Sequence, residues 1–95
     1  MLKMTEPTEV WVFNGVNSKF PSAVFWDKNA AEQWITNNML TGVLTKYPIG
    51  ISVYDWAIKN GHLKIKSEKD VSSEFIGRYS SSAQEHIHYE NGRAD

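Results

Sequence analysis

The sequence predicts an α+β domain: a mainly antiparallel sheet of four or five strands with one main helix on one face. Two runs rich in β-branched and aromatic residues, 9–13 and 22–26, flank the turn-forming pair Asn14-Gly15. A helical spacing of apolar residues follows directly over about 27–38. This succession of strand, turn, strand and helix is typical of a sheet that a helix covers on one side.

The first strand sends its side chains to both faces of the sheet. Val10 and Val12 point one way and Trp11 and Phe13 the other. We assign the two valines to the core. The opposite face is then either covered by the segment 55–79 or presents Trp11 and Phe13 to a partner.

The main helix has a start signal and an apolar stripe. Asp27 is a good N-cap, because its carboxylate accepts hydrogen bonds from free backbone N–H groups of the first turn. One apolar stripe recurs at three-to-four spacing: Ala30, Ala31, Trp34, Ile35 and Met39.

The C-terminal half predicts shorter elements. A third strand over 41–47 ends at Pro48. A short helix over about 55–60 is closed by Gly61 and begins at Asp55 as N-cap or slightly earlier. The alternating segment 62–66 suggests an edge strand, 72–79 either a short helix or an irregular turn, and 85–90 a last strand.

These elements define one domain over residues 9–92, with a flexible lead-in at 1–8 and a frayed tail at 93–95. The predicted core draws on every element: Val10, Val12, Val24, Ala31, Trp34, Ile35, Val43, Ile51, Trp56, Ile58 and Ile87.

Composition narrows the function classes. The chain has no cysteine, which excludes disulfides, thiol catalysis and thiolate metal sites. Its formal charge of −1, from 10 basic and 11 acidic residues, lacks the basic excess typical of duplex binders. No apolar run is long enough to cross a bilayer, so we expect a cytoplasmic protein without a membrane partner. Aromatic residues make up 13%, a high share that predicts an exposed aromatic contact surface if the core cannot hold them all.

Several short segments together resemble a family of small uncharacterised bacterial proteins, a domain of unknown function. The resemblance covers nearly all of residues 9–92, and the segments that carry it are Glu-Val-Trp-Val-Phe-Asn-Gly (9–15), Ala-Val-Phe (23–25), Ala-Glu-Gln-Trp-Ile (31–35), Leu-Thr-Gly-Val-Leu-Thr-Lys-Tyr-Pro (40–48), Val-Tyr-Asp-Trp-Ala-Ile (53–58), Phe-Ile-Gly-Arg-Tyr (75–79) and Gln-Glu-His-Ile-His-Tyr-Glu-Asn-Gly (84–92). The resemblance implies one autonomous fold unit and carries no activity, cofactor or site residue.

A His-x-His pair is the clearest candidate metal site. On a strand His86 and His88 face the same side, and their imidazoles suit Zn²⁺, with His62 as a third candidate nitrogen. The simpler interpretation is two histidines on a solvated face, with Ile87 and Tyr89 turned inward. We therefore predict no cofactor and hold the metal site as an alternative.

Two other weak signals lie in the C-terminal half. Asp55, flanked by Tyr54 and Trp56, is a candidate general acid, although an N-cap role explains it more simply. Arg78 and Tyr79 are candidate contact residues, but nucleic acid is an unlikely partner for a chain of this charge balance.

The function predicted is a small non-enzymatic protein-binding module, of which an immunity-type protein that sequesters a toxin is one version. The candidate contact residues are Trp11, Phe13, Asp55, Arg78 and Tyr79. In the toxin version seven acidic residues oppose a basic nuclease: Glu6, Glu9, Asp27, Glu32, Asp55, Glu85 and Glu90. The alternatives are a small hydrolase or metal-binding protein using His86 and His88, and a structural subunit or homodimer joined by a strand edge or by the aromatic face.

Overall fold

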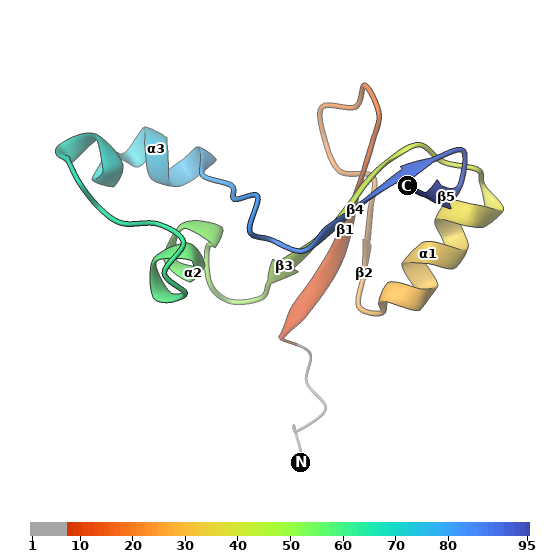
Figure 1. Ribbon diagram of the computed structural model, residues 1–95, viewed down its shortest axis with the longest axis horizontal. Helices are drawn as coiled ribbons and strands as arrows, with labels where there is room; N and C mark the ends of the chain where they lie inside the picture. Colours follow the sequence, from red (N-terminus) through yellow and green to blue (C-terminus); the bar gives the residue numbers. More distant parts are fainter. Residues whose placement is uncertain (1–7) are drawn as a thin grey trace, which may run out of the picture.

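All neighbouring strands of the sheet run antiparallel, in the order β2-β1-β3-β4-β5 (Figure 1). The computed structural model describes residues 8–95, so nearly all of the predicted lead-in at 1–8 lies outside the described residues. The strands are β1 (Glu9–Gly15), β2 (Ala23–Phe25), β3 (Gly42–Pro48), β4 (His86–Glu90) and β5 (Arg93–Ala94). The helices are α1 (Lys28–Asn37), α2 (Val53–Lys59), η2 (Glu68–Val71) and α3 (Ser73–Arg78). The α+β class and the antiparallel sheet are therefore confirmed.

Helix α1 starts and stops on local hydrogen bonds. The Asp27 carboxylate accepts the backbone N–H of Asn29 at 3.3 Å, so the predicted N-cap is confirmed. At the other end the backbone N–H and the side-chain amide of Asn38 both donate to the carbonyl of Trp34. Met39 then takes a positive φ of 53° and turns the chain back into the sheet.

The sheet buries its aromatic face rather than its valine face, and this corrects the prediction. Trp11 and Phe13 lie under α1, with only 6% and 2% of their surface exposed, whereas Val10 and Val12 are on the uncovered face and half-buried. Both faces of β1 are apolar, so alternation alone did not decide which one is covered. The larger rings remove more apolar surface from water, and Phe13 packs edge-on against Trp34 with ring centres 5.5 Å apart.

The other predicted core residues are partly confirmed and partly wrong. Ala31 and Ile35 are fully buried, and Trp34 and Ile87 pack partly buried against them. Val24 and Ile58 are exposed, so their core assignment is wrong. The remaining predicted members are half-buried: Val10, Val12, Val43, Ile51 and Trp56.

Close backbone contacts join β1 to β3 and join the β4–β5 turn to the end of α1. Gly42 at the start of β3 lies so near β1 that a Cβ there would meet the carbonyl oxygen of Asn14. Gly92, in the turn between β4 and β5, donates its N–H to the carbonyl of Leu40, and its own carbonyl accepts from the Thr36 hydroxyl. Arg93–Ala94, where the sequence predicts a frayed tail, pair with β4 as β5.

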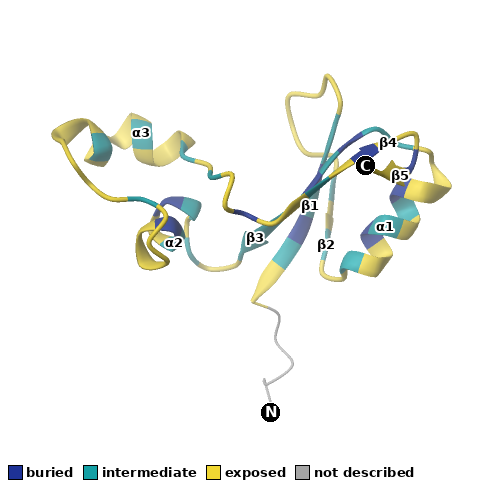
Figure 2. Cartoon of the chain, viewed as in Figure 1, coloured by how far each residue is buried: buried dark blue, intermediate teal, exposed yellow. Residues whose placement is uncertain are grey.

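A long connection between β3 and β4 projects sideways from the sheet and contains α2, η2 and α3 (Figure 1). We call residues 49–85 the arm. Its small core groups Tyr54 with Phe75 and Tyr79, all with ring centres 5.6–6.1 Å apart. Figure 2 shows the two groups of buried residues, one between α1 and the sheet and one in α2. The arm extends beyond the end of β3 and does not lie across the second face of the sheet (Figure 1).

Two predictions for the arm are corrected. The segment 62–66 forms no strand, because the N–H groups of His62 and Leu63 both donate to the carbonyl of Ala57 and fold the chain against α2. The N-cap of α2 is Ser52 rather than Asp55, in agreement with the alternative of an earlier start. Across residues 8–95, no helix has the length and apolar character needed to cross a membrane.

Candidate functional site

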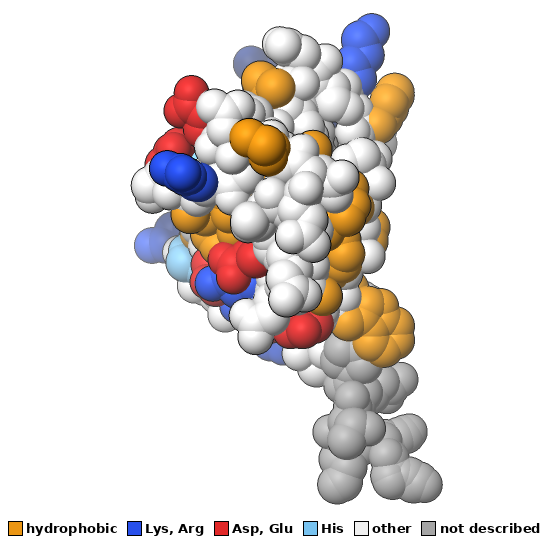
Figure 3. All heavy atoms as spheres, turned by 90° about the vertical axis from the view of Figure 1, so that its right-hand side faces the viewer, with side chains coloured by type: hydrophobic (Ala, Val, Ile, Leu, Met, Phe, Trp, Pro, Cys, Tyr) orange, Lys and Arg blue, Asp and Glu red, His pale blue; other side chains and the backbone are white. Residues whose placement is uncertain are grey.

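The edge of the sheet at β2 carries a row of exposed apolar side chains. Phe20 is 74% exposed, Trp26 70% and Val24 60%. We call these three residues the β2 rim. Figure 3 shows hydrophobic side chains along the right-hand margin of one face, with a basic side chain at its top, whereas most acidic and basic side chains lie towards the left. Contiguous exposed apolar surface of this kind marks contact sites more often than isolated exposed residues do.

Local geometry explains why the rim faces solvent. Asn17 takes a positive φ of 65°, and the Ser18 hydroxyl donates to the carbonyl of Phe20, so the hairpin loop closes on itself with the Phe20 ring outside. On the other side of β2, Phe25 packs on Trp34 with ring centres 5.5 Å apart. Trp26 lies between Phe25, the last residue of β2, and Asp27, the N-cap of α1, and its side chain stays outside the core.

The outer backbone edge of β2 is unpaired within the described part of the chain. β2 is the first strand of the sheet order and pairs only with β1. The segment 22–26 contains no Lys and no Pro, the residues that usually protect an edge strand from adding another strand. The rim therefore combines apolar side chains with free backbone donors and acceptors.

A charged cluster lies over Trp11, at the end of the sheet where β2 leads into α1. The Lys46 ammonium is 3.2 Å from Glu85 and 3.6 Å from Glu9, and Lys28 is 3.8 Å from Glu85. Hydrogen bonding to Glu85 and the charges of both glutamates raise the pKa of Lys46. Both ammonium groups also lie within 6 Å of the Trp11 ring. Two cations and two anions neutralise one another here, so the cluster stabilises the surface rather than attracting a charged ligand.

The His86 and His88 rings lie on the uncovered face of β4 with centres 5.4 Å apart. His86 Nδ1 is 2.8 Å from the carbonyl oxygen of Gln84, which requires the ring to donate from that nitrogen. His62 does not join them, because it packs on Trp56 in the arm with ring centres 5.3 Å apart. Residues 8–95 contain no group of three or more histidine or carboxylate side chains placed to hold one metal ion.

The five predicted contact residues do not share one surface. Trp11 and Phe13 are buried beneath α1, which corrects the expectation that their face is available. Asp55 lies in the first turn of α2, where its N–H bonds the Ser52 hydroxyl at 2.9 Å and its carboxylate accepts from the same hydroxyl at 3.0 Å. Arg78 pairs with Glu74 on α3 at 3.8 Å, and Tyr79 belongs to the aromatic group of the arm.

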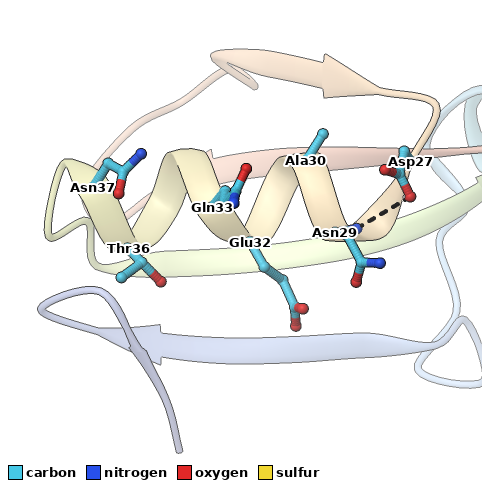
Figure 4. A pocket seen from close by; sticks show the side chains of 7 residues that line it. All are labelled: Asp27, Asn29, Ala30, Glu32, Gln33, Thr36 and Asn37. Carbon is cyan, nitrogen blue, oxygen red and sulfur yellow. Dashed lines mark hydrogen bonds between the residues drawn. The ribbon is translucent and has the colours of Figure 1, made fainter.

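The outward surface of α1 forms an open hollow of about 560 Å³. Figure 4 shows that its side chains diverge to both flanks of the helix instead of converging on one point. Glu32, on one flank, accepts a hydrogen bond of 2.8 Å from the Tyr89 hydroxyl. Burial and this bond raise the pKa of Tyr89. The hollow has no convergent set of polar groups and is a weaker candidate than the β2 rim.

Sequence reasoning missed Phe20 as a surface residue. Trp26 was available from the sequence as an aromatic residue between a strand and a helix cap, and the structure places it in the open. The signal for Phe20 was its position in a loop rich in polar residues, beside Pro21, where no strand or helix could bury it.

A family model described as a domain of unknown function (DUF7710) matches residues 10–95. No curated protein and no solved structure matches the chain.

Proposed function

This chain belongs to the family described as a domain of unknown function (DUF7710), and we propose that it is a non-enzymatic protein-binding module whose partner docks on the β2 rim. The observation that carries the proposal is the exposure of Phe20 and Trp26, two large aromatic side chains that flank β2, a strand paired on one edge only. Aromatic anchors of this kind contribute most of the binding free energy at many protein interfaces.

The size of the rim supports a contact of useful strength. Phe and Trp side chains bury about 150–250 Å² each, so the exposed parts of Phe20 and Trp26 present on the order of 300 Å². At about 25 cal/mol per Å² this corresponds to roughly 7–8 kcal/mol of gross burial free energy. Because association itself costs about 4–15 kcal/mol, the aromatic pair needs further contacts from the same surface.

The free edge of β2 supplies such contacts. An extended segment of a partner can add to the edge through main-chain hydrogen bonds, while its side chains meet Val24 and the flanking rings. This mode suits a three-residue edge strand, because the flanking aromatic residues extend the contact beyond the strand itself.

The toxin-sequestering version of the proposal depends on acidic residues that lie together. Glu9 and Glu85 do lie together, but both pair with Lys46. Glu32 accepts from the Tyr89 hydroxyl, and Asp27 caps α1. With these carboxylates already engaged, the apolar rim has stronger support than the acidic residues as the contact surface.

A comparative pull-down tests the proposal. The bait is the full chain, and the test variant carries Phe20→Ser together with Trp26→Ser. Ile65→Ser, in the arm, is the matched control because it also replaces an exposed apolar residue with serine. We expect one protein from an extract of the native organism to co-purify with the wild type and with the control, and to be lost with the double variant.

Two further measurements make the result decisive. Light scattering of the purified chain shows whether the captured protein is a second copy of the chain itself. Circular dichroism shows that the double variant is folded. Equal capture by the wild type and by the double variant would refute docking on the β2 rim.

A further inference from the structure

Strand β4 holds two imidazoles on one rigid, solvent-accessible face. His86 pairs with Thr45 and His88 with Val43 across the β3–β4 ladder, so the backbone beneath both rings is fixed. Both side chains are exposed on the face that α1 leaves uncovered, while Ile87 lies against the core from the other face. Binding a ligand between the rings therefore costs no further ordering of the backbone, only of the two side chains.

The separation of the rings fits one shared ion. Metal–imidazole bonds are about 2.0–2.1 Å long, and the ring centre lies about 1.2 Å behind the bound nitrogen, so two rings on one ion at tetrahedral or right angles have centres roughly 4.5–5.3 Å apart. The observed distance between the centres of His86 and His88 is 5.4 Å, with the ring planes 81° apart. The observed separation is therefore close to the range that two rings sharing one ion require.

The hydrogen bond from His86 prepares the ring for coordination. Its Nδ1–H donates to the carbonyl oxygen of Gln84, so in the neutral ring Nε2 keeps a free lone pair. Metal-binding histidines commonly make this bond, which fixes the tautomer and raises the basicity of the other nitrogen. Gln84 is itself buried and anchored, since its amide accepts from the N–H of Ser81 and donates to the carbonyl of Lys46.

We propose that His86 and His88 form a two-nitrogen binding site for a divalent transition-metal ion, with water in the remaining coordination positions. Imidazole nitrogens select Cu²⁺, Ni²⁺ and Zn²⁺ over Mg²⁺ and Ca²⁺, and Cu²⁺ binds such donors most tightly. The site lies on β4, three strands away from β2 in the sheet, and so is separate from the docking surface on the β2 rim.

Copper titration of the full chain, with any oligohistidine tag removed, tests the site. Calorimetry is expected to show one Cu²⁺ bound per wild-type chain. The affinity should fall at least about tenfold in His86→Ala and in His88→Ala, because each loses the chelate. His62→Ala is the matched control and should bind like the wild type, since that ring lies in the arm.

A further readout is independent of the affinities. Electron paramagnetic resonance should show two nitrogen donors on Cu²⁺ in the wild type and one in each single variant. Copper affinity that is equal in the wild type and in both single variants, or Ca²⁺ binding as tight as Cu²⁺ binding, would overturn the proposal. Circular dichroism confirms that the variants are folded.

Discussion

Replacing Gly42 with alanine should destabilise the fold strongly, because β1 and β3 meet at this point without room for a side chain. A Cβ at Gly42 would lie 2.2 Å from the carbonyl oxygen of Asn14, 2.7 Å from the Phe13 ring and 2.9 Å from the Cα of Gly15. Two of these three atoms belong to the backbone and cannot rotate away. The strands must therefore separate, and Phe13, which is fully buried, must shift with them.

The expected loss can be estimated from these distances. Overpacking a well-packed core costs about 1–3 kcal/mol, and clashes with backbone belong at or above the top of that range. We expect a loss of about 3 kcal/mol, against a total unfolding free energy of roughly 5–14 kcal/mol for 95 residues. At about 4–8 °C per kcal/mol, this loss lowers the Tm by roughly 12–24 °C.

Thermal unfolding followed by circular dichroism measures the shift, and Gly77→Ala is the matched control. A Cβ at Gly77 meets no atom within 4 Å, and the residue lies inside α3, where alanine is favoured over glycine by about 0.5–1 kcal/mol. The control should therefore leave the Tm unchanged or raise it slightly. A Gly42→Ala protein that melts within about 3 °C of the wild type would refute the packing argument.

The remaining predictions concern hydrogen bonds. Tyr89→Phe removes the bond to Glu32 and should lower the unfolding free energy by about 1 kcal/mol at neutral pH, as measured by urea unfolding. The pKa of Tyr89 is higher in the folded protein than in the unfolded chain, where it is about 10. The neutral phenol therefore contributes its full stability below about pH 10, and this contribution is lost as the pH rises above 10. Tyr89→Phe should reduce that alkaline loss but not abolish it, because burial also raises the pKa of Tyr54. An equal alkaline slope in both proteins would contradict this assignment. Ser52→Ala removes the N-cap of α2 and should weaken that helix by about 1 kcal/mol, seen as faster amide exchange in α2 with α1 unchanged. Uniformly faster exchange in both helices would show that the cap acts on the whole domain instead.

The order of elements was predictable from local signals, whereas the choice of buried face was not. The cap at Asp27 and the apolar stripe around Ile35 defined α1 closely. In β1 both sets of alternating residues are apolar, so the periodicity supplied no preference for either face. The helix above the sheet decides the matter, because Trp34 offers an aromatic partner to Phe13 that no single strand reveals.

The surface features depended on tertiary placement. Histidines two apart on a strand had to share a face, and β4 places them so. Their ring separation and the hydrogen bond to Gln84 required coordinates. Strand order decided which edge of the sheet is free: β2 is outermost, and sequence alone does not specify that position.

The arm joins two strands that are already neighbours in one antiparallel ladder. A tight turn could make the same connection, so the ladder does not depend on the length of residues 49–85. Closing a long loop instead of a short one changes the entropy only slowly with length. The arm is therefore the part of the fold where residues can be deleted, inserted or replaced. Such changes in its length should leave the register between β3 and β4 intact.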